Sequence, residues 1–323
     1  MKVGPYELAL KTRMLQELYS LAPIYELVPK LRGIGGEVLI LLDELDQGWD
    51  NTLHANRFIG SLLQAAIRIQ GLGLRAKVVA FLRSEIFDLV KGQLDQLDKL
   101  RSGIETLKWS DGELADLIVR RVSHSLSFNE SGIIFNLELV SSLFEGDFVG
   151  MNGFQYLLSR TSLRPREVLQ FLKVAHRTAL ELGETKITAE ALQKAEEEFS
   201  SWKLEHLCSE YTHIYPGLID LLWSFRANGP VIDEEDVVKV LEAYRSRLAD
   251  SLPDWAYNDN DRLLQLLYGI EFLGVPRPQT AKNRSGVIAD YEFAFDRRAV
   301  HITSAETFLI QPAVWSALEI PPA

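Results

Sequence analysis

The hydrophobic positions in the first third of the chain follow the order strand, helix, strand. Val38–Leu42 is a run of five apolar residues, and 78–82 is a second such run. Between them, apolar residues recur at helical spacing over 59–70, and glycines follow. Strands that are apolar on both faces are typical of a parallel sheet covered by helices on both sides. The pattern therefore predicts a right-handed β-α-β unit over 38–82 with two buried parallel strands.

The remainder of the chain is mostly helical in pattern. Apolar residues recur every three or four positions over 6–31, 110–122, 133–160, 165–172, 204–225, 233–249 and 262–273. Ser110 and Glu113 have the spacing of a capping box, and Pro165 suits a first helical position. Near the end, 291–295 and 299–303 flank a polar turn and predict a hairpin, and a last helix is expected over 308–318.

Composition and charge restrict the class of protein. The chain has 323 residues, of which 47% are hydrophobic, so two or three domains with their own cores are expected. A net charge of −11 argues against indiscriminate binding to nucleic acid or to an anionic membrane. Cys208 is the one cysteine, which excludes an internal disulfide and fits a reducing cytoplasm. No stretch of about 18 apolar residues predicts a membrane-spanning helix.

Two adjacent carboxylates, Asp43 and Glu44, directly follow the first predicted strand. Open α/β sheets bind ligands at the carboxyl ends of their strands. The stretch looks like a Walker B element, and this likeness implies that Asp43 holds Mg²⁺, directly or through water, and that Glu44 orients or deprotonates an attacking water. Arg83 follows the second strand and would emerge at the same edge. The alternative is that an ordinary strand ends in an acidic surface turn.

Arg164 and Arg166 flank Pro165 at the expected start of a helix. The N-terminus of a helix is the unfavourable end for cations, so these arginines need another reason for their position. Reaching an anion across a domain cleft is one such reason. Both residues are therefore candidates for contact with an anion, and the resemblance of this segment to the sensor-2 helix of AAA+ lid domains implies that the anion is a nucleotide.

Several other kinds of site find no support in the sequence. The phosphate-binding loop G-x-x-x-x-G-K-[ST] is absent, and the chain contains no Gly-Lys pair. The six histidines show no H-x-x-x-H spacing and have no partner cysteines, which disfavours zinc. A serine hydrolase would need G-x-S-x-G, which is also absent.

The order of these motifs resembles bacterial P-loop ATPases of the STAND/AAA+ type, especially the origin-recognition-like branch. The resemblance covers residues 37–320 and consists of a Walker B-like strand, a sensor-like arginine, an Arg-Pro-Arg helix start, and three helices with a hairpin. It implies an α/β fold followed by a mostly α part. The implied domains are a partial P-loop NTPase parallel sheet over 1–125, a helical lid over 126–200 and a winged-helix domain over 201–323.

The resemblance also implies roles for single residues. ATP would bind between core and lid, with the metal on Asp43, the attacking water on Glu44 and the γ-phosphate sensed by Arg83. Lid closure would act through Arg166, with Arg164 beside it. Because the chain has no phosphate-binding loop, such a protein would be truncated at its N-terminus or completed by another chain.

Three functions are compatible with these features. The first is an ATPase-type switch in signalling or defence, using ATP and Mg²⁺. The second is a nucleotide-free protein-interaction module that kept the ATPase architecture, and the third is a winged-helix DNA-binding regulator. Residues 201–323 hold 11 Lys/Arg and 18 Asp/Glu, which disfavours groove reading, although Arg297 and Arg298 could contact phosphate. We expect a protein partner or self-association, no membrane, and a cytoplasmic location.

Overall fold

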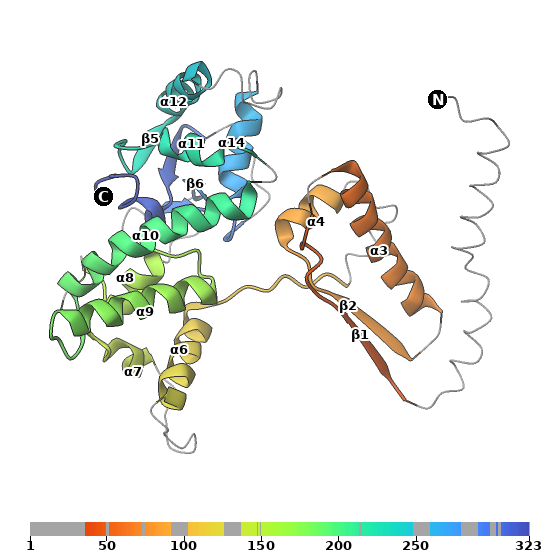
Figure 1. Ribbon diagram of the computed structural model, residues 1–323, viewed down its shortest axis with the longest axis horizontal. Helices are drawn as coiled ribbons and strands as arrows, with labels where there is room; N and C mark the ends of the chain where they lie inside the picture. The colour runs from red at the N-terminus through yellow and green to blue at the C-terminus, as the bar shows by residue number, and fades with distance from the viewer. Residues whose placement is uncertain are drawn as a thin grey trace. The chain divides into compact units, whose positions relative to one another are not determined.

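The computed structural model describes residues 36–49, 52–72, 75–91, 103–125, 137–146, 148, 150–212, 215–247, 259–278, 290–297, 302 and 305–322. The chain divides into two compact units, Met1–Thr106 and Leu107–Ala323 (Figure 1). It is of mixed α/β class, and its C-terminal part is largely helical. Among the described residues, no helix is long and apolar enough to cross a bilayer. The helix expected over 6–31 lies outside these residues.

The first unit contains the predicted β-α-β arrangement. Its elements are β1 (Val38–Leu42), α3 (Leu53–Gly71), β2 (Ala76–Ala80) and α4 (Ser84–Val90). β1 and β2 pair in parallel, with Val38 opposite Ala76 and Leu42 opposite Ala80. Thr52 caps α3 by accepting a hydrogen bond from the backbone N–H of Ala55 at 3.2 Å. The prediction of two parallel strands joined by a helix is confirmed, with β2 starting two residues earlier than expected.

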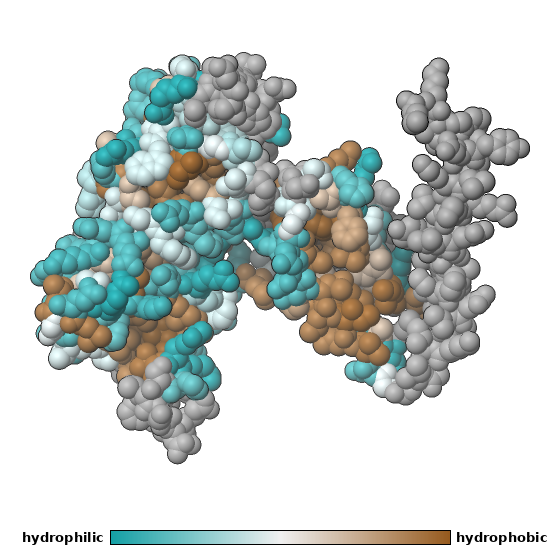
Figure 2. Space-filling model, viewed as in Figure 1, coloured by the Kyte–Doolittle hydropathy of each residue, from teal (hydrophilic) through white to brown (hydrophobic). Residues whose placement is uncertain are grey.

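The sheet of the first unit is less covered than the sequence predicts. Val38, Leu39 and Leu41 are 54%, 59% and 57% exposed. Because side chains alternate along a strand, Leu39 and Leu41 leave one face of β1 uncovered, and Val38 shows that the other face is only partly covered. α3 packs mainly on β2, where Val78 is buried, and Figure 2 shows the hydrophobic surface over the strand pair in brown. The expected burial of β1 on both faces is therefore wrong, since two strands and the described helices leave it open.

The second unit begins with a helical subdomain. Its elements are α6 (Asp111–Ser125), α7 (Leu137–Ser141), β3 (Phe144–Glu145), α8 (Gly153–Ser159), α9 (Pro165–Glu181), β4 (Ile187–Thr188) and α10 (Ala189–Tyr211). Its core includes Leu114, Ile118, Phe171 and Phe199, and the last two rings stack with centroids 4.4 Å apart. The capping box forms as predicted, with the Ser110 N–H donating to Glu113 at 2.8 Å. The apolar face of α6 belongs to this core, and the two compact units divide between residues 106 and 107, whereas the sequence analysis placed a domain boundary after residue 125.

A sheet subdomain completes the second unit. Its elements are α11 (Leu218–Trp223), β5 (Val231–Asp233), α12 (Glu234–Arg247), α14 (Asn260–Gly269), β6 (Leu273–Pro276), β7 (Tyr291–Glu292), β8 (Thr307–Ile310) and the 3-10 turn η5 (Pro312–Val314). The strands pair antiparallel in the order β5-β8-β6-β7. The boundary expected between 200 and 201 falls inside α10, whose two halves enter different cores.

Two sequence predictions concern the end of this subdomain. β7 pairs with β6, and the second half of the predicted hairpin, 299–303, lies outside the described residues apart from Ile302. The helix expected over 308–318 is wrong, because its first residues form β8 and a 3-10 turn follows. The apolar run of β8 is buried because it lies between β5 and β6, where a strand satisfies hydrogen bonds on both sides.

A glycine in the helical subdomain offers a test of its packing. A Cβ on Gly153 would lie 2.4 Å from Cγ of Phe144, which is buried. Gly153→Ala is expected to destabilise the second unit by about 1–3 kcal/mol, the usual cost of overpacking. The measurement is the urea midpoint followed by circular dichroism. In Gly112→Ala, where a Cβ meets no atom within 4 Å, the same measurement should show a gain of about 0.4–1 kcal/mol. Equal effects at the two positions would contradict the packing.

Candidate functional site

The carboxyl ends of β1 and β2 gather charged side chains at one edge of the first unit. The backbone N–H of Phe81 donates to the carbonyl of Leu42 at 2.8 Å, so the parallel pairing continues to the last residue of β1. The residues that follow both strands therefore leave the sheet at the same edge. We call Asp43, Glu44, Asp46 and Arg83 the strand-end group. Nη1 of Arg83 lies 4.0 Å from Oδ2 of Asp46.

A tight turn shapes the strand-end group. Glu44 has a φ of 56°, which lies in the left-handed region, and its backbone N–H donates to Oδ1 of Asp43 at 2.8 Å. The carbonyl of Glu44 accepts from Gln47 N–H at 3.0 Å, which reverses the chain. This reversal explains how Asp46, which the sequence reasoning did not select, comes near Arg83.

The turn is anchored to α3 by Trp49. The ring of Trp49 is buried, and its Nε1 donates to Oδ1 of the buried Asn56 at 2.8 Å. A buried hydrogen bond of this kind fixes the orientation of an indole. The loop after β1 is therefore held by a hydrogen bond whose nearer residue, Trp49, lies six positions after Asp43.

The strand-end group carries carboxylates that could contribute to a metal site. Within the part of the chain that the structure describes, no three His, Cys, Asp or Glu side chains are arranged to hold a metal ion. Asp43 and Glu44 are exposed. Mg²⁺ commonly keeps several waters and binds one or two carboxylates plus substrate phosphates. Asp43 at an open sheet edge can supply one such carboxylate.

The two arginines at the start of α9 lie in the second unit and differ in their surroundings. Arg164 precedes the helix and pairs with Glu271 at 3.0 Å, with Glu210 at 3.4 Å and with Glu167 at 4.0 Å. Burial alone would lower the pKa of Arg164, but these carboxylates raise it above its ordinary value. Arg166 is exposed and makes no ion pair with another described residue. Arg164 is thus engaged within the protein, whereas Arg166 is available to a ligand.

Beneath Arg164 lies a buried ion pair that the sequence reasoning missed. Nζ of Lys203 is 2.6 Å from Oε1 of Glu167, and both side chains are 3% exposed. Lys203 also donates to Oγ of Ser162 at 3.1 Å, and the Ser162 N–H donates to Glu167 at 2.8 Å. Burial would raise the pKa of Glu167, but the Lys203 ammonium and its neighbours hold it below the usual value. No spacing in the sequence marks Lys203, because its partner lies 36 residues away.

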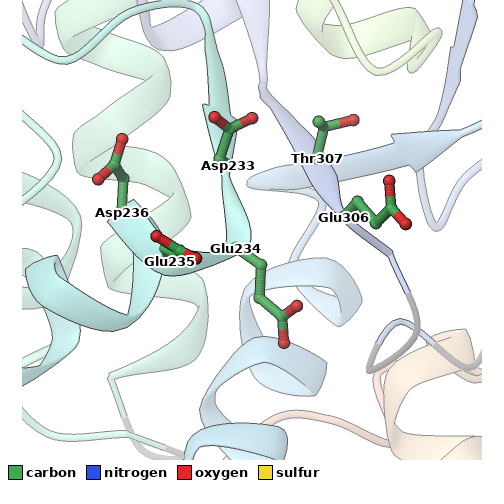
Figure 3. Close-up of a pocket in the computed structure, with 6 residues that line it drawn as sticks. All are labelled: Asp233, Glu234, Glu235, Asp236, Glu306 and Thr307. Atoms are coloured by element: carbon green, nitrogen blue, oxygen red, sulfur yellow. The ribbon is translucent and has the colours of Figure 1, made fainter.

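A pocket in the sheet subdomain is strongly acidic. It has a volume of about 450 Å³ and is lined by Asp233, Glu234, Glu235, Asp236, Glu306 and Thr307 (Figure 3). Three of these carboxylates lie in the first turn of α12, where negative charge is favourable for the helix dipole. Five acidic side chains around one pocket disfavour a phosphate ligand or a nucleic-acid backbone at this end of the subdomain.

Comparison with known proteins connects the second unit to a described domain. A family model for the FunZ-associated C-terminal helical domain matches residues 112–208, which run from α6 into α10. The chain is 25% identical over 292 residues to the putative transposon gamma-delta 80.3 kDa protein of Escherichia coli K12, covering 88% of this chain and 40% of that protein. It is 26% identical over 164 residues to Allergen Alt a 2 of Alternaria alternata, covering 50% of this chain and 85% of that protein. The chain thus spans about two fifths of the length of the transposon protein. No solved structure matches.

The buried ion pair predicts a large effect of Lys203→Met. Removing the ammonium leaves the buried Glu167 with only Arg164, at 4.0 Å, and the Ser162 N–H as partners, which is expected to destabilise the second unit by about 3 kcal/mol in urea unfolding. Adding Glu167→Leu should recover most of this loss. Lys194→Met, in the same helix, removes an exposed pair with Glu190 and should cost less than about 1 kcal/mol. A loss equal to that of Lys194→Met would contradict the proposed burial.

The same variant has an expected pH dependence. In the wild type the pKa of Glu167 is lowered from 4.5, so its stabilising contribution is present above that value and is lost as the pH falls through the lowered pKa. Without Lys203, burial raises the pKa of Glu167, and protonation at acid pH removes the buried charge. The stability difference between wild type and Lys203→Met should therefore be smaller at about pH 4 than at about pH 7. Urea midpoints at both pH values test this, and an unchanged difference would contradict it.

Proposed function

We propose that this chain is the C-terminal portion of an ATPase-type molecular switch of the STAND/AAA+ kind. The observation that carries the proposal is the parallel pairing of β1 with β2, which presents Asp43, Glu44 and Arg83 at one edge. Hydrolysis of a bound triphosphate requires an acidic pair and a sensor-like arginine close together. In an ATPase core these residues lie at the ends of neighbouring strands.

The phosphate-binding loop belongs, in this proposal, to polypeptide that the chain does not contain. The transposon relative is far longer than the matched region, and the matching domain is described as C-terminal. The exposed Val38, Leu39 and Leu41 support the same idea, because parallel strands are normally covered on both faces. A neighbouring segment of the same protein, or a second protein, would complete the sheet at β1.

The residues of the strand-end group have distinct roles in the proposed site. A bound Mg²⁺–ATP would supply the phosphate to be attacked and the charge that polarises it. Asp43 would hold the metal ion and Glu44 would orient the attacking water. Arg83 would sense the γ-phosphate, and Asp46 would position the guanidinium when the phosphate is absent.

From the helical subdomain, Arg166 would be the residue that contacts nucleotide. Its side chain is exposed at the start of α9 and has no carboxylate partner among the described residues. Arg164 would act indirectly, because three carboxylates already engage it. In this proposal the helical subdomain serves as the lid of the switch.

We also propose that the sheet subdomain is of the winged-helix type and contacts protein. Among the described elements, the chain order is helix, strand, two helices and then strands, and the first of these strands pairs with the last as β5 with β8. Contact with DNA is disfavoured, since Arg297 already pairs with Glu292 at 3.3 Å and the acidic pocket lies in the same subdomain.

The test is nucleotide-dependent thermal stability of the protein as it is encoded. Sequencing upstream of the Met1 codon should show an in-frame G-x-x-x-x-G-K-[ST], or a neighbouring gene should carry it. That protein, or the two chains together, should gain about 2.7 kcal/mol of stability at a Mg²⁺–ATP concentration of 100 times Kd. Asp43→Ala should abolish the gain, and Glu44→Gln should keep it while slowing hydrolysis by about 10²–10⁴-fold.

Asp88→Ala provides the matched control. Asp88 lies in α4 of the same unit and pairs with Lys91 at 2.6 Å. The ATP-dependent gain should survive this substitution. If Mg²⁺–ATP gives no increase in stability, or an equal increase in Asp43→Ala and wild type, the proposal of an ATPase switch is wrong. Such a result would favour a nucleotide-free interaction module.

A further inference from the structure

The helical and sheet subdomains of the second unit share one continuous helix. α10 has 23 residues, and its first half contributes Phe199 to the helical core while its second half contributes Leu204 to the other core. A helix without a break between two cores transmits a rotation without an internal hinge. Whether the other elements of the two subdomains move together with α10 depends on the side-chain contacts around this helix.

One buried arginine ties the helical subdomain to the C-terminal segment 311–320. Arg160 donates to Glu196 of α10 at 2.8 Å, and the two side chains are 6% and 11% exposed. Its guanidinium carbon also lies 4.7 Å from the ring centre of Tyr156 and 4.9 Å from that of Trp315. The cation is therefore held between an aromatic ring from each side of the boundary, and separation of the subdomains would remove Trp315 while Tyr156 and Glu196 stay with Arg160.

A second group of contacts closes the boundary near the start of α9. Ser162 Oγ accepts from Lys203 and, at 3.3 Å, from Nε2 of the buried Gln311. Arg164 reaches Glu271, which follows α14 and is 3% exposed at its side chain. These contacts join residues 107 to 149 positions apart in sequence. They pair the loop before α9 with two separate parts of the sheet subdomain.

The C-terminal segment is also inserted into the helical subdomain by its backbone and by apolar packing. The backbone N–H of Ala317 donates to Oγ of Ser200, a fully buried residue of α10, at 2.9 Å. Ala313 is fully buried and belongs to the helical core, although it follows β8. The segment thus contacts both cores rather than lying over the surface of one.

Buried ion pairs of this kind contribute more to a defined geometry than to net stability. Breaking one by removal of a partner costs about 3–5 kcal/mol, because a buried charge is left without compensation. A hinge at this boundary would have to separate Arg160 from Trp315 and Arg164 from Glu271 together. The contacts therefore oppose any partial opening.

We infer that segment 311–320, with Arg160 and Arg164, clamps the helical and sheet subdomains into one rigid body. Arg164 is a positioning residue of this clamp. The rigidity of the two subdomains is inferred from these contacts alone. Only the idea that nucleotide binding moves this rigid body rests on the proposed function. If the lid closes on nucleotide through Arg166, the sheet subdomain moves with it and presents the change directly to a protein partner.

Spin-label distance measurements on the whole chain test the clamp without nucleotide. Lys173→Cys in α9 and Glu242→Cys in α12 place exposed labelling sites on the two subdomains. The native Cys208 is buried, and burial raises its thiol pKa to about 12, so it should label slowly. The wild type is expected to give one narrow distance distribution. A broad or bimodal distribution would overturn the inference, whatever the outcome with ATP.

A variant that removes both partners of each pair tests the cause of the rigidity. Arg160→Met with Glu196→Gln, combined with Arg164→Met and Glu271→Leu, removes both members of the two most buried pairs. Of the other partners of Arg164, Glu167 keeps Lys203 and Glu210 is partly exposed, so folding should be preserved. The distance distribution should broaden at least twofold. The control is Arg177→Met with Glu198→Leu, which removes an exposed pair of the helical subdomain. This control should leave the distance distribution unchanged. A distribution as narrow in the clamp variant as in the wild type would show that α10 alone sets the geometry.

Discussion

The parallel pairing of β1 with β2 is the constraint on which the candidate site depends. A parallel ladder brings the residues after each strand to the same edge, whatever their distance in sequence. Asp43 and Arg83 are 40 positions apart, yet both leave the sheet at this edge. An antiparallel arrangement of the same segments would send them to opposite ends. The interpretation of the strand-end group as one site therefore depends on the direction of the strands more than on any single side chain.

The two units differ in how completely they bury their apolar side chains. In the second unit the cores are filled by aromatic and aliphatic side chains, and even charged residues such as Glu167 and Lys203 are buried with partners. The first unit leaves the apolar side chains of β1 exposed. A large exposed apolar surface commonly marks an interaction site. This contrast is the structural reason for proposing that further polypeptide completes the first unit, whereas the second needs no such addition to its cores.

The arginines at the start of α9 show why position in a motif does not fix a role. Arg164 and Arg166 are two residues apart on either side of Pro165, and the helix dipole disfavours both equally. Glu271 stabilises one of them and comes from a loop 107 positions away. Its location could not be inferred from periodicity, because long-range contacts depend on how the subdomains pack. The acidic partners turn Arg164 into a structural residue and leave Arg166 exposed.

The sequence by itself determined the local elements and their chemistry: the β-α-β unit over 38–82, the cap at Ser110, the start of α9 at Pro165, and the placement of Asp43, Glu44 and Arg83 at strand ends. These follow from hydrophobic periodicity and from the capping preferences of single residues. Only the tertiary structure decided that α6 belongs to the second unit, that 307–310 forms a central strand, and that Lys203 pairs with Glu167. Each of these depends on which surfaces meet, and an apolar run of a few residues is equally compatible with a strand or a helix until a neighbouring strand is present to bond with it.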